Sequence, residues 1–261
     1  MDVYAGIDGT GPLDNASYRT QFARSFVSRL QRERSWGKSY YLRGPTMDGQ
    51  ETRQLSRQIL REVEGDLHRT TARRVERVVV AGYSRGGAAA IRLCRELGRH
   101  GHAVDALLLF DAVDMSLTVA ADLVPANVRT CFHARRDPAS LSRSFWDNCG
   151  RGAEDASRTR YVEHFFRCTH GGMGGVPWTV ADSDGVINEA ATDRTLSGRI
   201  VRGAGLPGLP FAALNEIHRY SSRTSVTLAQ DRIVSAQVGA WMFGHLDRVL
   251  AAKRRTPALT S

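Results

Sequence analysis

The sequence predicts an α/β fold with a mostly parallel central sheet and helices on both faces of that sheet. Short apolar, β-branched runs alternate along the chain with stretches of helical periodicity. The 261 residues are enough for one large core, and 42% hydrophobic and 24% charged residues are close to globular averages. Polar side chains follow several predicted strands, at the sheet edge where α/β proteins bind ligands. We therefore expect one domain over residues 1–252 and a loose C-terminal tail over 253–261.

The first part of the chain already shows the alternation. An apolar run predicts a strand at 3–7, ending in the glycine-rich turn 8–12. One helical face is predicted by residues that recur every four positions: Tyr18, Phe22, Phe26 and Leu30. A short strand at 39–42 and an amphipathic helix at 55–67 follow.

The alternation continues to the C-terminus. A buried strand at 75–81 runs into Gly82-Tyr83-Ser84-Arg85-Gly86-Gly87, and helical spacing follows until Gly98. Further strands are predicted at 106–110, 128–132 and 162–168. The Gly-, Asp- and Pro-rich stretch 177–210 predicts a long loop or partial lid, and apolar spacing over 233–249 predicts a closing helix.

Composition and charge restrict the class of protein. No run of about 18 apolar residues and no basic, apolar leader occurs, so we expect synthesis in the cytoplasm without a signal peptide. The net charge of +9 comes almost wholly from scattered arginines, which argues against a nucleic-acid partner but leaves peripheral contact with an anionic membrane open. The cysteines lie far apart without a C-x-x-C pair, which predicts free core thiols and no metal site: Cys94, Cys131, Cys149 and Cys168.

The segment 82–86 matches G-x-S-x-G between a predicted strand and a predicted helix. In that setting a serine occupies a tight strand-to-helix turn, and glycines on either side avoid clashes with neighbouring backbone. The Arg85 N–H at the helix start would face a developing oxyanion. The sequence thus predicts an α/β-hydrolase fold with Ser84 as its nucleophile.

A serine nucleophile needs a base, and His170 fits best. It follows the last predicted strand among glycines, in the chain order nucleophile, acid, base that is typical of this fold. His133 is its main competitor. Asp111, Asp114 and Asp137 all follow strands and are candidates for the acid that orients the imidazole, and the pattern alone does not choose among them.

Four blocks of the chain together resemble a known family. They are 7–11 (I-D-G-T-G), 82–87 (G-Y-S-R-G-G), 110–113 (F-D-A-V) and 169–175 (T-H-G-G-M-G-G). In order, they are similar to D-G-T-x-N, G-F-S-R-G-A, W-D-T-V-G and H-x-D-V-G-G-G of the bacterial α/β-hydrolase domain of type VI secretion lipase effectors. The chain departs from this pattern at Pro12 and Gly172, which stand where the family has asparagine and aspartate.

The resemblance implies lipase or phospholipase activity with Ser84, Asp111 and His170 as the triad, which favours Asp111 over Asp137 as the acid. It also implies that Gly9 and Thr10 supply an oxyanion donor beside Arg85. Export by a type VI secretion system as an antibacterial effector, and an immunity or secretion partner, are implied in the same way.

The leading hypothesis is therefore hydrolysis of carboxylic esters, in particular lipid or phospholipid acyl esters, through an acyl-serine intermediate that requires no cofactor. Two alternatives remain. One is a general esterase or thioesterase, and the other is a non-catalytic secretion adaptor on a hydrolase fold. Apolar residues of the loop could rim an acyl groove: Leu206, Pro207, Leu209, Pro210 and Phe211.

Overall fold

A computed structural model describes residues 1–12, 14–45, 52–69, 75–114, 121–143, 147–189 and 222–252. Its centre is a six-stranded sheet of order β2-β1-β3-β4-β5-β6 in which every neighbouring pair is parallel. The strands are β1 Asp2–Ile7, β2 Lys38–Leu42, β3 Arg77–Tyr83, β4 Ala106–Phe110, β5 Thr130–Arg136 and β6 Arg160–Phe166. The predicted parallel sheet is confirmed.

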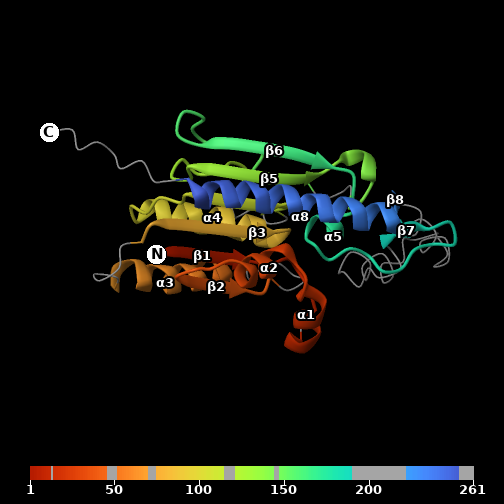
Figure 1. Ribbon diagram of the computed structural model, residues 1–261, viewed down its shortest axis with the longest axis horizontal. Coiled ribbons are helices and arrows are strands. Elements are labelled where there is room, and N and C mark those ends of the chain that lie inside the picture. The colour runs from red at the N-terminus through yellow and green to blue at the C-terminus, as the bar shows by residue number, and fades with distance from the viewer. Residues whose placement is uncertain are drawn as a thin grey trace, which may run out of the picture.

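Helices cover both faces of this sheet, so the predicted α/β-hydrolase architecture is also confirmed (Figure 1). The helices are α1 Asn15–Phe22, α2 Phe26–Glu33, α3 Thr52–Arg69, α4 Arg85–Arg99, the short α5 His170–Met173 and α8 Leu228–Ala251. On one face, α3 and α4 pack on alternate residues of β1, β3 and β4. On the other face, α2 and α8 bury the intervening residues of the same strands.

The single helical face predicted around 18–30 is divided between two helices. Tyr18 and Phe22 lie on α1, and Phe26 and Leu30 lie on α2, with all four buried in one cluster. Ser25 caps α2 by accepting from Ser28 N at 3.1 Å, and its hydroxyl also bonds Asp8. The buried Ser25, as the N-cap of α2, therefore separates the two helices, although the hydrophobic spacing continues across the break.

Three strands are displaced from their predicted ranges. β3 extends two residues further, to Tyr83; β6 begins and ends two residues earlier; and β5 extends to Arg136 instead of 132. The prediction that His133 follows a strand is wrong, because it lies in the middle of β5. The register of β5 against β6 pairs every residue from 130 to 136, which apolar patterning alone does not reveal.

Beyond the carboxyl ends of the strands, Figure 1 shows α5, β7 and β8. β7 Val186–Asn188 and β8 Arg223–Thr227 form a two-stranded antiparallel sheet that leads into α8. Residues 190–221, with the predicted acyl-groove residues 206–211, lie outside the described ranges, as does the tail 253–261. That residues 1–252 form one domain stays a prediction.

The four cysteines are free and buried. Cys94 of α4, Cys131 of β5 and Cys149 lie in the core on the α3–α4 side of the sheet, and Cys168 lies in the core on the other side. In the described part of the chain, no helix combines the length and the apolar character that a membrane crossing requires.

Candidate active site

Ser84 occupies the turn between β3 and α4. Its backbone has φ 56° and ψ −131°, a conformation that side-chain-bearing residues rarely adopt. Three bonds hold it there: Ser84 N donates to Phe110 O at 3.1 Å, and Ser84 O accepts from Gly87 N at 2.9 Å and Val113 N at 3.1 Å. The side chain is thereby presented at the edge of the sheet in a fixed position.

The glycines around Ser84 are required by close backbone approaches. A Cβ at Gly86 would lie 2.2 Å from Asp8 O, and a Cβ at Gly82 would lie 2.5 Å from Gly86 O. Such contacts with backbone cannot be relieved by a side-chain rotation. The glycine spacing of the motif therefore follows from the packing of β3, α4 and the β1 loop.

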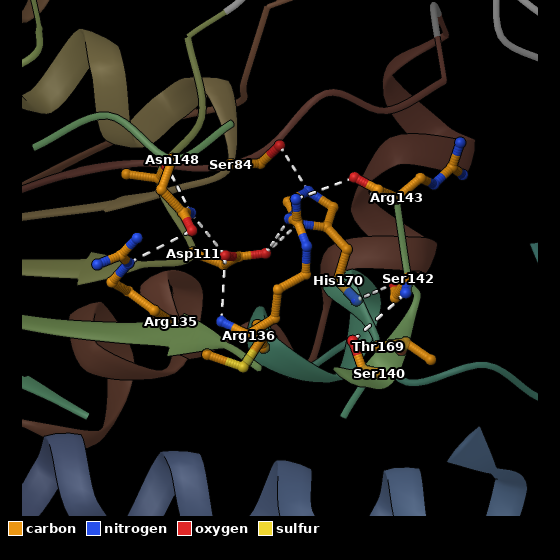
Figure 2. Close-up of polar contacts among 12 residues, drawn as sticks. Ser84, Asp111, Arg135, Arg136, Ser140, Ser142, Arg143, Asn148, Thr169 and His170 are labelled. Atoms are coloured by element: carbon orange, nitrogen blue, oxygen red, sulfur yellow. Dashed lines mark hydrogen bonds and ion pairs between the residues drawn. The ribbon is translucent and has the colours of Figure 1, made fainter. Parts of the chain in front are cut away.

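Two side chains from other parts of the chain meet Ser84 (Figure 2). His170 Nε2 lies 2.9 Å from Ser84 Oγ, and His170 Nδ1 lies 2.6 Å from Asp111 Oδ2. All three residues are at least 94% buried. Because an ionised carboxylate can only accept, Nδ1 carries the proton and Nε2 is free to accept the Ser84 proton. The geometry is that of a nucleophile, a base and an orienting acid.

Asp111 lies directly after β4 with φ 44°, and four donors surround its carboxylate. Oδ1 accepts from Asn148 Nδ2 at 2.7 Å and from Arg136 N at 3.3 Å, and Oδ2 accepts from Arg136 Nη1 at 2.5 Å as well as from His170. Burial by itself would raise the pKa of Asp111, but the Arg136 guanidinium, His170 and Asn148 together hold it well below its ordinary value. The acid is therefore ionised throughout the range in which a histidine titrates.

Arg136 also contacts the base. Its Nη1 lies 3.2 Å from His170 Nδ1, and its Nη2 donates to Arg143 O at 3.0 Å. Burial lowers the pKa of His170, the bond and charge of Asp111 raise it, and the charges of Arg136 and Arg143 lower it, leaving it below the usual value. His170 therefore stays neutral, the form that a general base requires, to a lower pH than an ordinary histidine.

Two further carboxylates position the loops around the base. Glu189 accepts from Ser142 Oγ at 2.7 Å, and the same Ser142 Oγ accepts from His170 N at 2.7 Å. Asp231, at the start of α8, accepts from Thr169 N at 2.7 Å and Thr169 Oγ1 at 3.0 Å. Thr169 and the backbone N–H of His170 are thus fixed by buried acids from distant segments.

The departure from the family pattern at Gly172 has a steric explanation. A Cβ at this position would lie 2.5 Å from Asp231 Oδ1, so the carboxylate of α8 occupies the space that a side chain at 172 would need. Ser235 Oγ, one turn further along α8, donates to Gly172 O at 2.7 Å. A side chain at position 172 of this base turn, residues 169–175, would therefore have to displace the Asp231 carboxylate, which bonds Thr169.

The predicted oxyanion residues lie next to Ser84. A Cβ at Gly9 would be 3.2 Å from Ser84 Cβ, and Arg85 is the first residue of α4. Gly9 N donates to Asp8 Oδ1 at 3.0 Å, which occupies that N–H. Thr10 Oγ1 is buried and has no hydrogen-bond partner among the described residues.

Asp8 anchors the loop that holds Gly9 and Thr10. Besides Gly9 N, its carboxylate accepts from Tyr41 Oη at 2.9 Å and from Ser25 Oγ. Burial raises the pKa of Asp8 to about 6, and these three donors oppose that rise. The loop therefore rests on a carboxyl group that titrates near physiological pH.

The competing candidates have other roles. His133 is fully buried; its Nε2 accepts from Ala112 N at 3.3 Å, and its Nδ1 lies 3.2 Å from Gly150 O. Burial lowers its pKa to about 4. Asp137 caps the short 3₁₀ helix Pro138–Ser140 by accepting from Ala139 N at 2.8 Å, and Asp114 is half-buried beyond the turn that follows β4. It is Asp111 that lies at hydrogen-bond distance from His170.

Sequence reasoning missed several residues that shape the site. Arg136 is the last residue of β5, one position before the candidate Asp137, so a correct strand end would have indicated it. No sequence signal marks Asn148, Ser142, Glu189 or Asp231. Among the described residues, no group of three or more His, Cys, Asp or Glu side chains is arranged to hold a metal ion.

No protein-family model matches the sequence, and no curated protein is similar to it in sequence. Solved structures with a similar fold include the Tle1 effector bound to the VgrG spike of the type 6 secretion system, at 14% identity and TM-score 0.40. This match covers 66% of the present chain but spans only 50% of the Tle1 chain.

Two other solved structures are similar at the same level. A YdeN-like hydrolase from Pectobacterium atrosepticum is 16% identical with TM-score 0.34, over 65% of this chain and 79% of that one. The RedJ thioesterase of prodiginine biosynthesis in Streptomyces coelicolor is 13% identical with TM-score 0.37, over 67% and 80%. Because these structural similarities are weak, the fold class rests on the strand order of the sheet, and any functional conclusion rests on the geometry of the site.

Proposed function

We propose that this chain is a serine hydrolase that cleaves carboxylic esters, with lipid acyl esters as its substrate class. The observation that carries the proposal is the relay from Ser84 Oγ to His170 Nε2 at 2.9 Å and from His170 Nδ1 to Asp111 Oδ2 at 2.6 Å. The relay is buried at the carboxyl edge of a parallel sheet, where the chemistry of this fold takes place.

In the first half of the reaction, His170 Nε2 takes the Ser84 proton while Oγ attacks the ester carbonyl carbon. Asp111 keeps the imidazole oriented and stabilises its positive charge. The Arg85 N–H at the start of α4 and the Thr10 hydroxyl and N–H donate to the oxyanion. Collapse of the tetrahedral intermediate expels the alcohol, which receives the proton from His170, and leaves acyl-Ser84.

In the second half, water enters and His170 takes one of its protons as the water attacks the acyl carbon. The second tetrahedral intermediate expels Ser84 Oγ, which regains a proton from His170 and releases the carboxylic acid. Apart from the ester and the water, each step uses only groups of the chain itself. A thioester would react by the same steps, with a thiol as the leaving group.

Lipid acyl esters are proposed on the strength of the four sequence blocks, which resemble type VI secretion lipase effectors. The same resemblance supports export by a type VI secretion system as an antibacterial effector, with an immunity or secretion partner. Release into the medium that stops when the secretion apparatus is removed is the test of export. A non-catalytic adaptor is disfavoured because the relay is complete and its donors are satisfied.

The decisive experiment labels the protein with a fluorophosphonate and compares wild type with Ser84→Ala. A serine activated by this relay should be labelled in the wild type alone, and mass spectrometry should place the adduct on Ser84. Turnover of phospholipid vesicles, soluble short-chain esters and acyl thioesters then ranks the substrate classes. An unlabelled but correctly folded wild type would contradict the proposed mechanism, and much faster turnover of short esters would leave a general esterase.

A further inference from the structure

A groove of about 550 Å³ lies between α2 and the N-terminal part of α8. It opens on the face of the sheet opposite to α3 and α4. Its lining is unusual in charge, because four arginines and a single acid surround it: Arg24, Arg29, Arg32, Arg232 and Glu33. Four guanidinium groups against one carboxylate leave the groove with a net charge of +3.

Two of the arginines are held in place by their neighbours on α2. Arg29 Nε donates to Glu33 Oε1 at 2.8 Å, and its guanidinium lies 5.0 Å from the centre of the Phe243 ring on α8. Arg32 donates to Ala23 O at the end of α1. Their positive charge is therefore fixed along one wall of the groove. Because these side chains are already ordered, a ligand that binds them loses little free energy to side-chain ordering.

The other two arginines are exposed and come from opposite walls. Arg24 lies between α1 and α2, and Arg232 lies on α8. Within the described ranges, neither makes a hydrogen bond or ion pair with the protein. Guanidinium groups are planar, multiple donors that match phosphate oxygens, so two unpaired arginines facing one groove form a ready site for a phosphate group.

The groove is continuous with the base turn of the candidate active site. Gly175 and Pro177, which follow His170 in the chain, line it, and Phe26 N on its floor donates to Gly174 O at 2.9 Å. An exposed apolar side chain adjoins the basic ones: Ile233, next to Arg232 on α8, is 61% exposed. Basic and apolar residues combined at one surface are characteristic of peripheral membrane contact.

We propose that this groove binds the phosphate headgroups of anionic phospholipids and docks the chain on a membrane surface with the active-site edge beside it. The choice of a lipid headgroup over free phosphate rests on the proposed ester hydrolase function and on the exposed Ile233 beside Arg232. A nucleic-acid backbone would need a longer basic track than a single groove of this volume provides.

The test measures sedimentation with vesicles, using the full chain with Ser84→Ala so that the lipid is not consumed. Vesicles of phosphatidylcholine alone are compared with vesicles that also contain phosphatidylglycerol, at low and high salt. The groove pair Arg24→Gln/Arg232→Gln should bind the anionic vesicles roughly 30-fold more weakly, the loss expected for two basic residues at an anionic surface, and salt should remove the difference.

A matched control comes from the opposite face of the sheet. Arg57→Gln/Arg61→Gln removes the same two charges from exposed positions of α3, and this pair should retain most of the binding. Glu33→Gln removes the one acid of the groove and should strengthen binding to anionic vesicles. Thermal unfolding of each variant verifies that it is folded.

Equal losses for the groove pair and the α3 pair would show that only total charge matters and would overturn the proposal. Tight binding of inorganic phosphate alone, lost in the groove pair, together with no preference for anionic vesicles would make free phosphate the occupant and also overturn it. If the wild type hydrolyses no ester while the groove pair still controls vesicle binding, the proposed function fails and the groove assignment stands.

Discussion

Replacement of Arg136 by glutamine should shift the pH dependence of ester hydrolysis toward higher pH. His170 must be neutral to accept the Ser84 proton, so the acid limb of kcat/KM follows its pKa in the free enzyme. Burial is the largest cause that lowers this pKa. The charges of Arg136 and Arg143 lower it further, whereas Asp111 raises it. Removal of the Arg136 charge removes one lowering effect, the pKa rises, and the rate at low pH falls.

The magnitude follows from the distances. Arg136 Nη1 lies 3.2 Å from His170 Nδ1, and two unit charges about 4 Å apart interact with about 4 kcal/mol at an effective dielectric constant of about 20. The delocalised guanidinium charge and the reorganisation of Asp111 reduce this value. Because one pKa unit corresponds to about 1.4 kcal/mol, even a third of the interaction moves the acid limb upward by about one pH unit.

The assay is kcat/KM for a soluble p-nitrophenyl ester across the acid range, for wild type, Arg136→Gln and Arg136→Lys. Lysine keeps the charge but cannot make both the Asp111 and the Arg143 contacts, so its acid limb should stay close to that of the wild type. Thermal unfolding separates loss of fold from loss of rate. A lower plateau with an unchanged acid limb in Arg136→Gln would refute the electrostatic role and leave Arg136 as a purely structural residue.

Four other outcomes are expected. Ser84→Ala should keep its fold and lose about 10⁴ to 10⁶ of p-nitrophenyl ester turnover, and retained turnover would exclude Ser84 as the nucleophile. Asp111→Asn should lose about 10⁴ in kcat because the imidazole tautomer is no longer fixed. Asp137→Asn keeps an oxygen that can cap the 3₁₀ helix and should lose little activity, and the reverse order would make Asp137 the acid. Thr10→Val should lower kcat by about 10², since it removes a buried, unpartnered hydroxyl, and an unchanged kcat would exclude that hydroxyl from the oxyanion site. Burial raises the pKa of Asp8 from 3.8 to about 6, so the folded state binds this proton more tightly and stability falls between these pH values as pH rises, by on the order of 3 kcal/mol. Urea unfolding against pH should show this fall in the wild type and not in Asp8→Asn.

The sequence by itself determined the order of strands and helices around the nucleophile. Buried parallel strands are apolar on both faces, and helices carry a periodic apolar stripe, so each element leaves a local pattern. G-x-S-x-G identified Ser84 because the glycines that let the β1 loop approach α4 stand two residues from the serine, so this tertiary requirement leaves a short pattern in the sequence. His170 was indicated by its place after the last strand of the sheet.

The tertiary structure decided what depends on contacts between distant segments. Asp111, Asp114 and Asp137 all follow strands, and only the strained backbone of Asp111 and the position of the base turn bring one carboxylate to His170. Arg136 became visible only with the true end of β5, because hydrogen bonding to β6 extends that strand past its apolar run. Asp231, held against Thr169 from a helix 62 residues away in the chain, leaves no local signal, since its role exists only once α8 packs on the base turn.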